Sequence, residues 1–227
     1  MQRTHDALPA DRSTAHWPCQ LRRNLVPSVI DPANKSALRK ELRRRRRALD
    51  RAQQRVAAKQ LYRRVNTSAL FRFSSRIAFT MAADGEIDPG LLLAEAQRRG
   101  KRCYLPVLSP VGPPRLRFRR WRRGDVLRAN FYGIAEPRSG AYCPPRALSL
   151  VLMPLVGFDA SCNRIGMGKG YYDRTFAFRR HSDSARPVLL GLAHECQRVE
   201  KLQAEAWDLP LDGVVTDQAW YGPESDS

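Results

Sequence analysis

The sequence predicts one α/β domain, because strand-length apolar runs alternate with segments that have helical spacing. Residues 77–81 and 102–108 are short apolar runs, and a helical pattern at 89–99 separates them, beginning at Asp88. These three segments make a β-α-β unit. Residues 148–156 form a continuous apolar run, which is typical of a strand buried on both faces. A chain of 227 residues is long enough for one large core and short for two, so we expect a single domain.

The N-terminal part of the chain is expected to contain a leader and two helices. Residues 1–33 contain four prolines and no sustained period, which is typical of a flexible leader. A first helix is predicted to begin at Asn34, because leucines recur near helical spacing after it, and it carries an uninterrupted arginine run at 43–47. A second helix is predicted at about 51–68, with one apolar face and one basic face.

The C-terminal half continues the alternation of strands and helices. The predicted elements are a half-exposed strand at 116–121, a helix at 171–180, a buried strand at 188–193, a helix at 195–205 and a last strand at 213–216. We place the domain at 34–220 and a short tail at 221–227.

The composition of the chain argues against a membrane protein, a disulfide-rich protein and a zinc protein. The chain lacks a run of about 20 apolar residues and a signal-peptide core, so we expect no membrane partner and a cytoplasmic location. Its five cysteines are scattered and form no C-x-x-C pair, which argues against a disulfide framework or a zinc site. The net charge of +18 attracts anions, including nucleotides and nucleic acids.

The segment Arg164-Ile-Gly-Met-Gly-Lys-Gly-Tyr-Tyr-Asp173 has the pattern of a phosphate-binding loop. Glycines at alternate positions leave backbone N–H groups free to converge on an anion, and Arg164 and Lys169 add positive charge. Asp173 could hold Mg²⁺, a hard cation that prefers carboxylate oxygen. The segment is neither a Walker A loop nor a Rossmann fingerprint. A glycine-rich turn that only packs a strand against a helix is the alternative interpretation.

These residues resemble the 5-formyltetrahydrofolate cyclo-ligase family, also called 5,10-methenyltetrahydrofolate synthetases. The most specific match is Met153-Pro-Leu-Val-Gly-Phe-Asp159 followed by residues 163–173. The family's order also contains the matches at 35–39 (KSALR), 84–87 (DGEI) and 208–212 (DLPLD). The sequence departs from the family in its leader, in its long arginine run, and at Cys162, in a turn where glycine is usual.

The resemblance implies a three-layer α/β/α sandwich with a central, largely parallel sheet. It also implies ATP- and Mg²⁺-dependent cyclisation of 5-formyltetrahydrofolate to 5,10-methenyltetrahydrofolate, with release of ADP and phosphate. The γ-phosphoryl group would be transferred to the formyl oxygen, and N10 would attack the resulting iminium phosphate. We expect reduced folate and ATP as small-molecule substrates and a monomeric protein.

The resemblance assigns roles to individual residues. The predicted ATP contacts are Lys35, Arg39, Arg164, Ile165, Gly166, Met167, Gly168, Lys169, Gly170, Tyr171 and Tyr172. The predicted Mg²⁺ ligands are Asp173 and Asp208, and the predicted folate contacts are Met81, Glu86, Met167 and Tyr171. Lys169 and Arg164 are the predicted catalytic residues; Lys169 is our candidate for stabilising charge on the transferred phosphoryl group. Asp159 and Asp212 could equally be structural, and His194 is assigned no role.

A nucleic-acid-binding protein on the same fold is the competing hypothesis. Its phosphate contacts would be the arginine run at 43–47 and the arginines of 119–123. Apart from Trp121, these stretches lack the interleaved aromatic residues of an RNA-stacking surface. We therefore interpret both clusters as solvated helix and strand faces.

Overall fold

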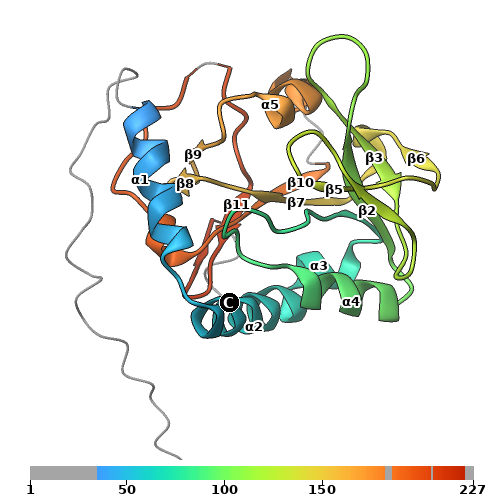
Figure 1. Ribbon diagram of the computed structural model, residues 1–227, viewed down its shortest axis with the longest axis horizontal. Coiled ribbons are helices and arrows are strands. Elements are labelled where there is room, and N and C mark those ends of the chain that lie inside the picture. Colours follow the sequence, from blue (N-terminus) through green and yellow to red (C-terminus); the bar gives the residue numbers. More distant parts are fainter. Residues whose placement is uncertain (1–34, 182–185, 206, 223–227) are drawn as a thin grey trace, which may run out of the picture.

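A central eight-stranded sheet organises the protein. The computed structural model describes residues 35–181, 186–205 and 207–222, and its sheet has the order β12-β11-β10-β7-β1-β2-β3-β6 (Figure 1). The five inner strands are parallel: β11 (Gly213–Val215), β10 (Val188–Leu192), β7 (Leu150–Pro154), β1 (Arg76–Ala78) and β2 (Arg102–Leu108). The outer strands pair antiparallel: β12 (Trp220–Tyr221), β3 (Leu116–Arg120) and β6 (Tyr142–Cys143). The predicted largely parallel sheet is confirmed.

Helices cover both faces of this sheet. The helices α2 (Arg51–Thr67), α3 (Ala69–Phe73) and α4 (Gly90–Arg98) lie along one face, while α1 (Lys35–Arg47) and α5 (Tyr171–Thr175) lie on the other side (Figure 1). Successive side chains of a strand point to opposite faces. In β7, Leu150 and Leu152 accordingly pack with α2 and α4, whereas Val151 and Met153 pack with Phe176. The three-layer prediction is therefore confirmed.

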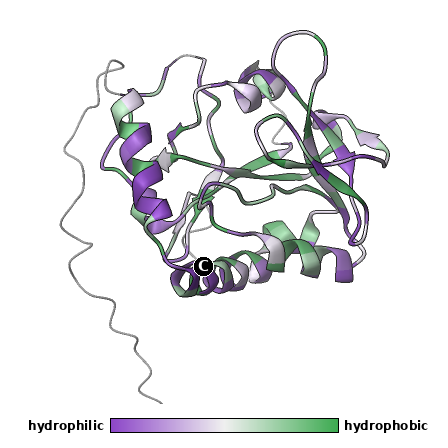
Figure 2. Cartoon of the chain, in the orientation of Figure 1, coloured by the Kyte–Doolittle hydropathy of each residue, from purple (hydrophilic) through white to green (hydrophobic). Residues whose placement is uncertain are grey.

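The helix α1 packs away from the main sheet. Leu38 and Leu42 are buried against Val156, Ile165 and the segment around Val199, which form a separate small cluster. Val156 and Ile165 belong to the turn and hairpin made by β8 (Gly157–Phe158) and β9 (Arg164–Ile165). Outside this contact the helix is strongly polar, as its hydrophilic colour in Figure 2 shows. Hence the apolar stripe of α1 fixes one arginine-rich helix beside the glycine-rich segment.

Several predicted boundaries agree with the structure and some elements were not predicted. The helix at 51–68 is confirmed; Asp50 caps it by accepting a hydrogen bond from Gln53 N at 2.8 Å. The last predicted strand, at 213–216, is confirmed as β11. Unpredicted elements are α3, the hairpin of β4 (Leu127–Ala129) and β5 (Ala135–Pro137), the pair β8–β9, β6, β12, and the 3₁₀ turn η3 (Pro145–Ala147). The strands in this group have only two or three residues, which gives periodicity little to reveal.

The predicted helix at 195–205 is wrong. Only a 3₁₀ turn, η5 (Glu195–Gln197), forms there, and the predicted helix at 171–180 likewise divides into α5 and the 3₁₀ turn η4 (Ala177–His181). The backbone amides of Val199 and Leu202 donate to Phe158 O at 2.9 Å and to Asp159 Oδ2 at 2.8 Å. These tertiary hydrogen bonds use amides that a continuous helix would need for its own ladder.

The predicted leader at 1–33, Asn34 and most of the predicted tail lie outside the described residues, although Tyr221 is part of β12. In the described ranges, no helix combines the length and apolarity needed to cross a membrane.

Candidate functional site

The glycine-rich segment follows the hairpin β8–β9 and leads into α5. Gly168 and Gly170 have φ values of +83° and +63°, in the left-handed region that strains any residue with a Cβ atom. Gly170 is the residue immediately before α5. The backbone of this loop therefore depends on glycine at two of its three glycine positions. Cys162 lies in the turn where the resemblance led us to expect a glycine, and it adopts a left-handed φ of +62° although it carries a side chain.

Basic residues of α1 face this loop. Arg39 Nε donates a hydrogen bond to Gly166 O at 2.9 Å, and a Cβ atom at Gly168 would lie 3.5 Å from Arg39 Cζ. The structure thus brings together three predicted ATP contacts. Lys35, one turn earlier, is paired with Glu205 at 3.0 Å, so a phosphate group would compete with that carboxylate.

The two predicted Mg²⁺ ligands lie on neighbouring segments. Asp173 forms an ion pair with Arg164, and its Oδ1 also accepts a hydrogen bond from Leu209 N at 3.2 Å. Leu209 follows Asp208, whose Oδ2 accepts from Glu205 N at 2.9 Å. Within the described ranges no group of three or more His, Cys, Asp or Glu side chains could hold a metal. Two carboxylates nevertheless suit Mg²⁺, which usually keeps several waters and binds phosphate oxygens with one or two carboxylates.

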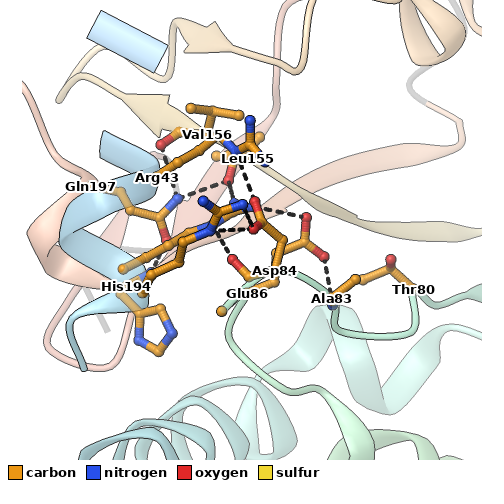
Figure 3. A network of polar contacts seen from close by, with 12 residues as sticks. Arg43, Thr80, Ala83, Asp84, Glu86, Leu155, Val156, His194 and Gln197 are labelled. Atoms are coloured by element: carbon orange, nitrogen blue, oxygen red, sulfur yellow. Dashed lines mark hydrogen bonds and ion pairs between the residues drawn. The ribbon is translucent and has the colours of Figure 1, made fainter. Parts of the chain in front are cut away.

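Glu86 lies on the loop that follows β1, with its carboxylate largely buried. Its Oε2 accepts a hydrogen bond from Ala83 N at 3.2 Å (Figure 3). Its Oε1 is 3.6 Å from the Arg46 guanidinium. Burial raises the pKa of Glu86 to about 7, and the positive charge of Arg46 opposes that rise. A carboxylate with this pKa changes its charge near neutral pH.

Tyr172 connects the glycine-rich loop with Glu86. Burial raises the pKa of its hydroxyl, the negative charge of Glu86 raises it further, and Arg164 opposes the rise. The two segments also follow paired parallel strands, β1 and β7. The loop's predicted phosphate contact and the predicted folate anchor therefore lie at the same edge of the sheet, at the carboxyl ends of parallel strands, where α/β folds commonly bind ligands.

The remaining predicted site residues differ from one another in how far their side chains are buried. Ile165 is buried under α1, so its side chain is unavailable to a ligand, while Met167 is half exposed and Lys169 is exposed. Tyr171 meets Tyr132 of the β4–β5 hairpin edge-on, with ring centroids 6.3 Å apart. Met81 packs against the core beside α2 and α4. Met81 and Tyr171 lie at the margins of the core clusters, and the side chains of Met167 and Lys169 are exposed.

The interpretation of the arginine run as a solvated face is wrong for Arg46, which is fully buried, whereas Arg44 and Arg47 are exposed. Arg43, Arg46 and Arg47 all contact the carboxylate of Asp84, and Arg44 and Arg45 pair with Glu41 in the same helix. Asp84 holds this position with φ +54°, and the three arginines keep its pKa at about 2 despite opposing burial. The spacing of Leu38, Leu42 and Arg46 was the missed signal, since residues four apart share one helix face.

The other arginine cluster is also engaged within the fold. Arg119 donates to Pro137 O at 3.2 Å, and its guanidinium stacks on the Tyr142 ring, 4.4 Å from the centroid. It lines a cavity of about 290 Å³ with Arg128 and Arg138, beside the β4–β5 hairpin. Arg119 is therefore engaged within the fold, whereas Arg122 and Arg123 are exposed as expected of a solvated face.

Asp159 and His194 are buried, whereas the side chain of Asp212 is partly exposed. Asp159 accepts hydrogen bonds from Ser161 N, Asn163 N and Nδ2, and Leu202 N, so it organises the turn before the glycine-rich loop. Asp212 pairs with Arg179 at 2.8 Å and accepts from Leu189 N. His194 is 1% exposed, and burial lowers its pKa.

Comparisons with known proteins identify the family of the chain. The family model "5-formyltetrahydrofolate cyclo-ligase family" matches residues 31–217. A 5-formyltetrahydrofolate cyclo-ligase of Escherichia coli K12 is 40% identical over 177 residues, which cover 77% of this chain and 96% of that protein. The Haemophilus influenzae protein of the same name is 36% identical over 188 residues, covering 82% and 99%.

A solved structure gives the same result for the fold. The NMR structure of Aquifex aeolicus 5,10-methenyltetrahydrofolate synthetase superimposes with a TM-score of 0.72 at 27% identity, covering 86% of this chain and 95% of that one. The family match spans most of the chain and includes both the glycine-rich loop and Glu86. The chain belongs to the 5-formyltetrahydrofolate cyclo-ligase family.

Proposed function

We propose that this protein uses ATP and Mg²⁺ to convert 5-formyltetrahydrofolate into 5,10-methenyltetrahydrofolate, releasing ADP and phosphate. One observation carries the proposal: β1 and β7 are paired parallel strands, so the loop with Glu86 and the segment that leads to the glycine-rich loop leave the sheet at the same edge. A folate held by Glu86 and a phosphate held by the glycine-rich loop would therefore be neighbours. Family membership and the names of the relatives support the same activity.

The chemistry requires activation of a poor leaving group. An N5-formyl group is an amide, and its oxygen cannot leave unaided. Transfer of the γ-phosphoryl group to that oxygen gives an iminium phosphate, which N10 attacks before phosphate departs. The protein's main tasks are to align the two substrates and to neutralise the charge that develops on the phosphoryl group.

Each part of the site has a task in this proposal. Arg39 and the backbone of the glycine-rich loop bind the ATP phosphates, together with Arg164 and with Lys35 once it leaves Glu205. Asp173 and Asp208 would hold Mg²⁺, which neutralises phosphate charge when it is bound. The ionised Glu86 accepts hydrogen bonds from the pterin N–H groups.

The other loop residues complete the two binding sites. Met81, Met167 and Tyr171 line the folate side, and Lys169, exposed on the loop, closes over the phosphoryl group and stabilises its charge. The expected monomeric state and cytoplasmic location stay predictions.

The direct test follows the absorbance of the methenyl product with 5-formyltetrahydrofolate, Mg²⁺ and ATP. We expect an ATP-dependent rise that Asp173→Ala abolishes. Asp125→Ala is the matched control, because Asp125 accepts a hydrogen bond from Arg122 N in a distant turn and is expected to leave the rate unchanged. Folded protein that binds ATP yet forms no methenyl product would refute the substrate assignment.

A further inference from the structure

Arg46 is a fully buried arginine whose hydrogen bonds join two segments of the site. Its guanidinium donates to Asp84 O at 2.9 Å, Asp84 Oδ2 at 2.8 Å and Leu155 O at 3.0 Å. An unpaired buried charge is very costly, so a guanidinium at 0% exposure persists only where acceptors surround it. Arg46 therefore fixes the loop after β1 against the end of β7.

The same junction includes a third segment. Gln197, in η5 after β10, donates from Nε2 to Leu155 O at 2.8 Å and to Val156 O at 2.9 Å (Figure 3). Leu155 and Val156 lead from β7 into the hairpin that precedes the glycine-rich loop. The loop that carries Glu86 and the segment that leads to the glycine-rich loop are thus connected at Leu155 O, which accepts hydrogen bonds from both Arg46 and Gln197.

Arg46 differs from its neighbours in the arginine run. Arg43 and Arg47 also contact Asp84, but their side chains are 34% and 53% exposed. Of the ion pairs within the described residues, only that of Arg46 reaches Glu86, at 3.6 Å from Oε1. A purely structural arginine would need Asp84 and Leu155 but not a second carboxylate.

We propose that Arg46 is a positioning residue for Glu86, fixing its loop and supplying the positive charge that keeps its carboxylate ready to accept hydrogen bonds from the pterin. This inference rests on the proposed function. Arg46 itself touches neither substrate. Arg46 acts through Glu86, so substitution of Arg46 weakens the binding of folate and leaves the binding of ATP unchanged.

The charges around Glu86 determine how its pKa changes when Arg46 is substituted. Burial is the largest cause that raises its pKa and Asp84 adds to it, whereas Arg46 and, more weakly, Arg43 lower it; Tyr172 is the other titratable group in reach. Removing the Arg46 charge raises the pKa of Glu86 above its value of about 7. More of the protein would then carry a protonated Glu86 at neutral pH, unable to accept two hydrogen bonds.

The test compares Arg46→Gln, Arg46→Lys and Arg47→Gln for the pH dependence of KM for 5-formyltetrahydrofolate and for ATP. For Arg46→Gln we expect the acid-side rise in the folate KM to move up by at least about one pH unit, which raises the KM about fivefold at pH 7 and about tenfold at about pH 5. The ATP KM should stay within about twofold. Arg47→Gln, which loses a contact to the same Asp84, should retain the wild-type profile.

The lysine variant keeps the inference testable if Arg46→Gln does not fold. Lysine retains the charge but cannot reach all three acceptors, so we expect a several-fold higher folate KM with little change in its pH profile. Wild-type values in a folded Gln variant, or in the Lys variant if Gln fails, would overturn the inference. Wild-type protein that forms no methenyl product would instead refute the proposed function.

Discussion

We predict that the buried carboxylate of Glu86 lowers the stability of the protein above neutral pH. Its pKa is about 7 in the folded protein, against an ordinary value of 4.5. The unfolded chain therefore loses this proton near pH 4.5 and the folded protein only near pH 7, so stability falls as pH rises between the two values. The 2.5-unit difference amounts to about 3 kcal/mol above neutral pH, at about 1.4 kcal/mol per unit.

The substitution Glu86→Gln should remove this cost, since the amide carries no charge and can still accept the hydrogen bond from Ala83 N. Arg46 keeps its contacts to Asp84 and Leu155. We expect the free energy of unfolding to increase by about 3 kcal/mol at about pH 8 and by less than about 1 kcal/mol at about pH 5.

Urea unfolding of both proteins at the two pH values measures this difference. Glu95→Gln is the matched control: Glu95 pairs with Arg98 and Arg99 on the surface, its pKa is lowered to about 2, and its loss should give no gain at either pH. A Glu86→Gln protein no more stable than wild type at the higher pH, or equally stabilised at both, would refute the reasoning.

Three further predictions concern the loop and its support. Lys169→Met should lower kcat by at least about tenfold with little change in stability, because Lys169 is exposed; normal turnover would remove it from the catalytic set. Gly168→Ala should cost about 1 kcal/mol in thermal unfolding because of its φ of +83°, and should raise the KM for ATP; an unchanged KM would mean that the loop does not bind phosphate. Asp159→Ala should lower the free energy of unfolding by about 2 kcal/mol or more, since it leaves amides of the turn and of Leu202 unpaired; a neutral effect in urea would contradict its structural role.

Most of the fold was predictable because its long elements carry clear periodicity. The run at 148–156, the β-α-β unit around α4 and the apolar face of α2 were found from periodicity, whereas the largely parallel central sheet was implied by the family resemblance. The prediction of a helix at 195–205 was wrong for a physical reason, because backbone amides of this segment donate tertiary hydrogen bonds to Phe158 and Asp159. No local pattern indicates such partners.

The candidate site was predictable where chemistry lies in consecutive residues. The glycine-rich loop can be recognised in the sequence because its backbone requires glycine at Gly168 and Gly170. Glu86 and Asp208 were found only through the family resemblance, since a lone carboxylate has no distinctive spacing. Arg46 was missed because a run of five arginines suggests a solvated face, and the burial of one member depends on the distant residues Asp84 and Leu155.

The most direct test of the central claim, phosphoryl transfer to a folate held beside the glycine-rich loop, follows the formyl oxygen. 5-Formyltetrahydrofolate labelled with heavy oxygen in its formyl group is turned over with ATP, and the released phosphate is analysed by mass spectrometry. The proposed chemistry predicts one labelled oxygen in each phosphate, because that oxygen bonds to the γ-phosphorus before it leaves. Unlabelled phosphate released together with the methenyl product would contradict it.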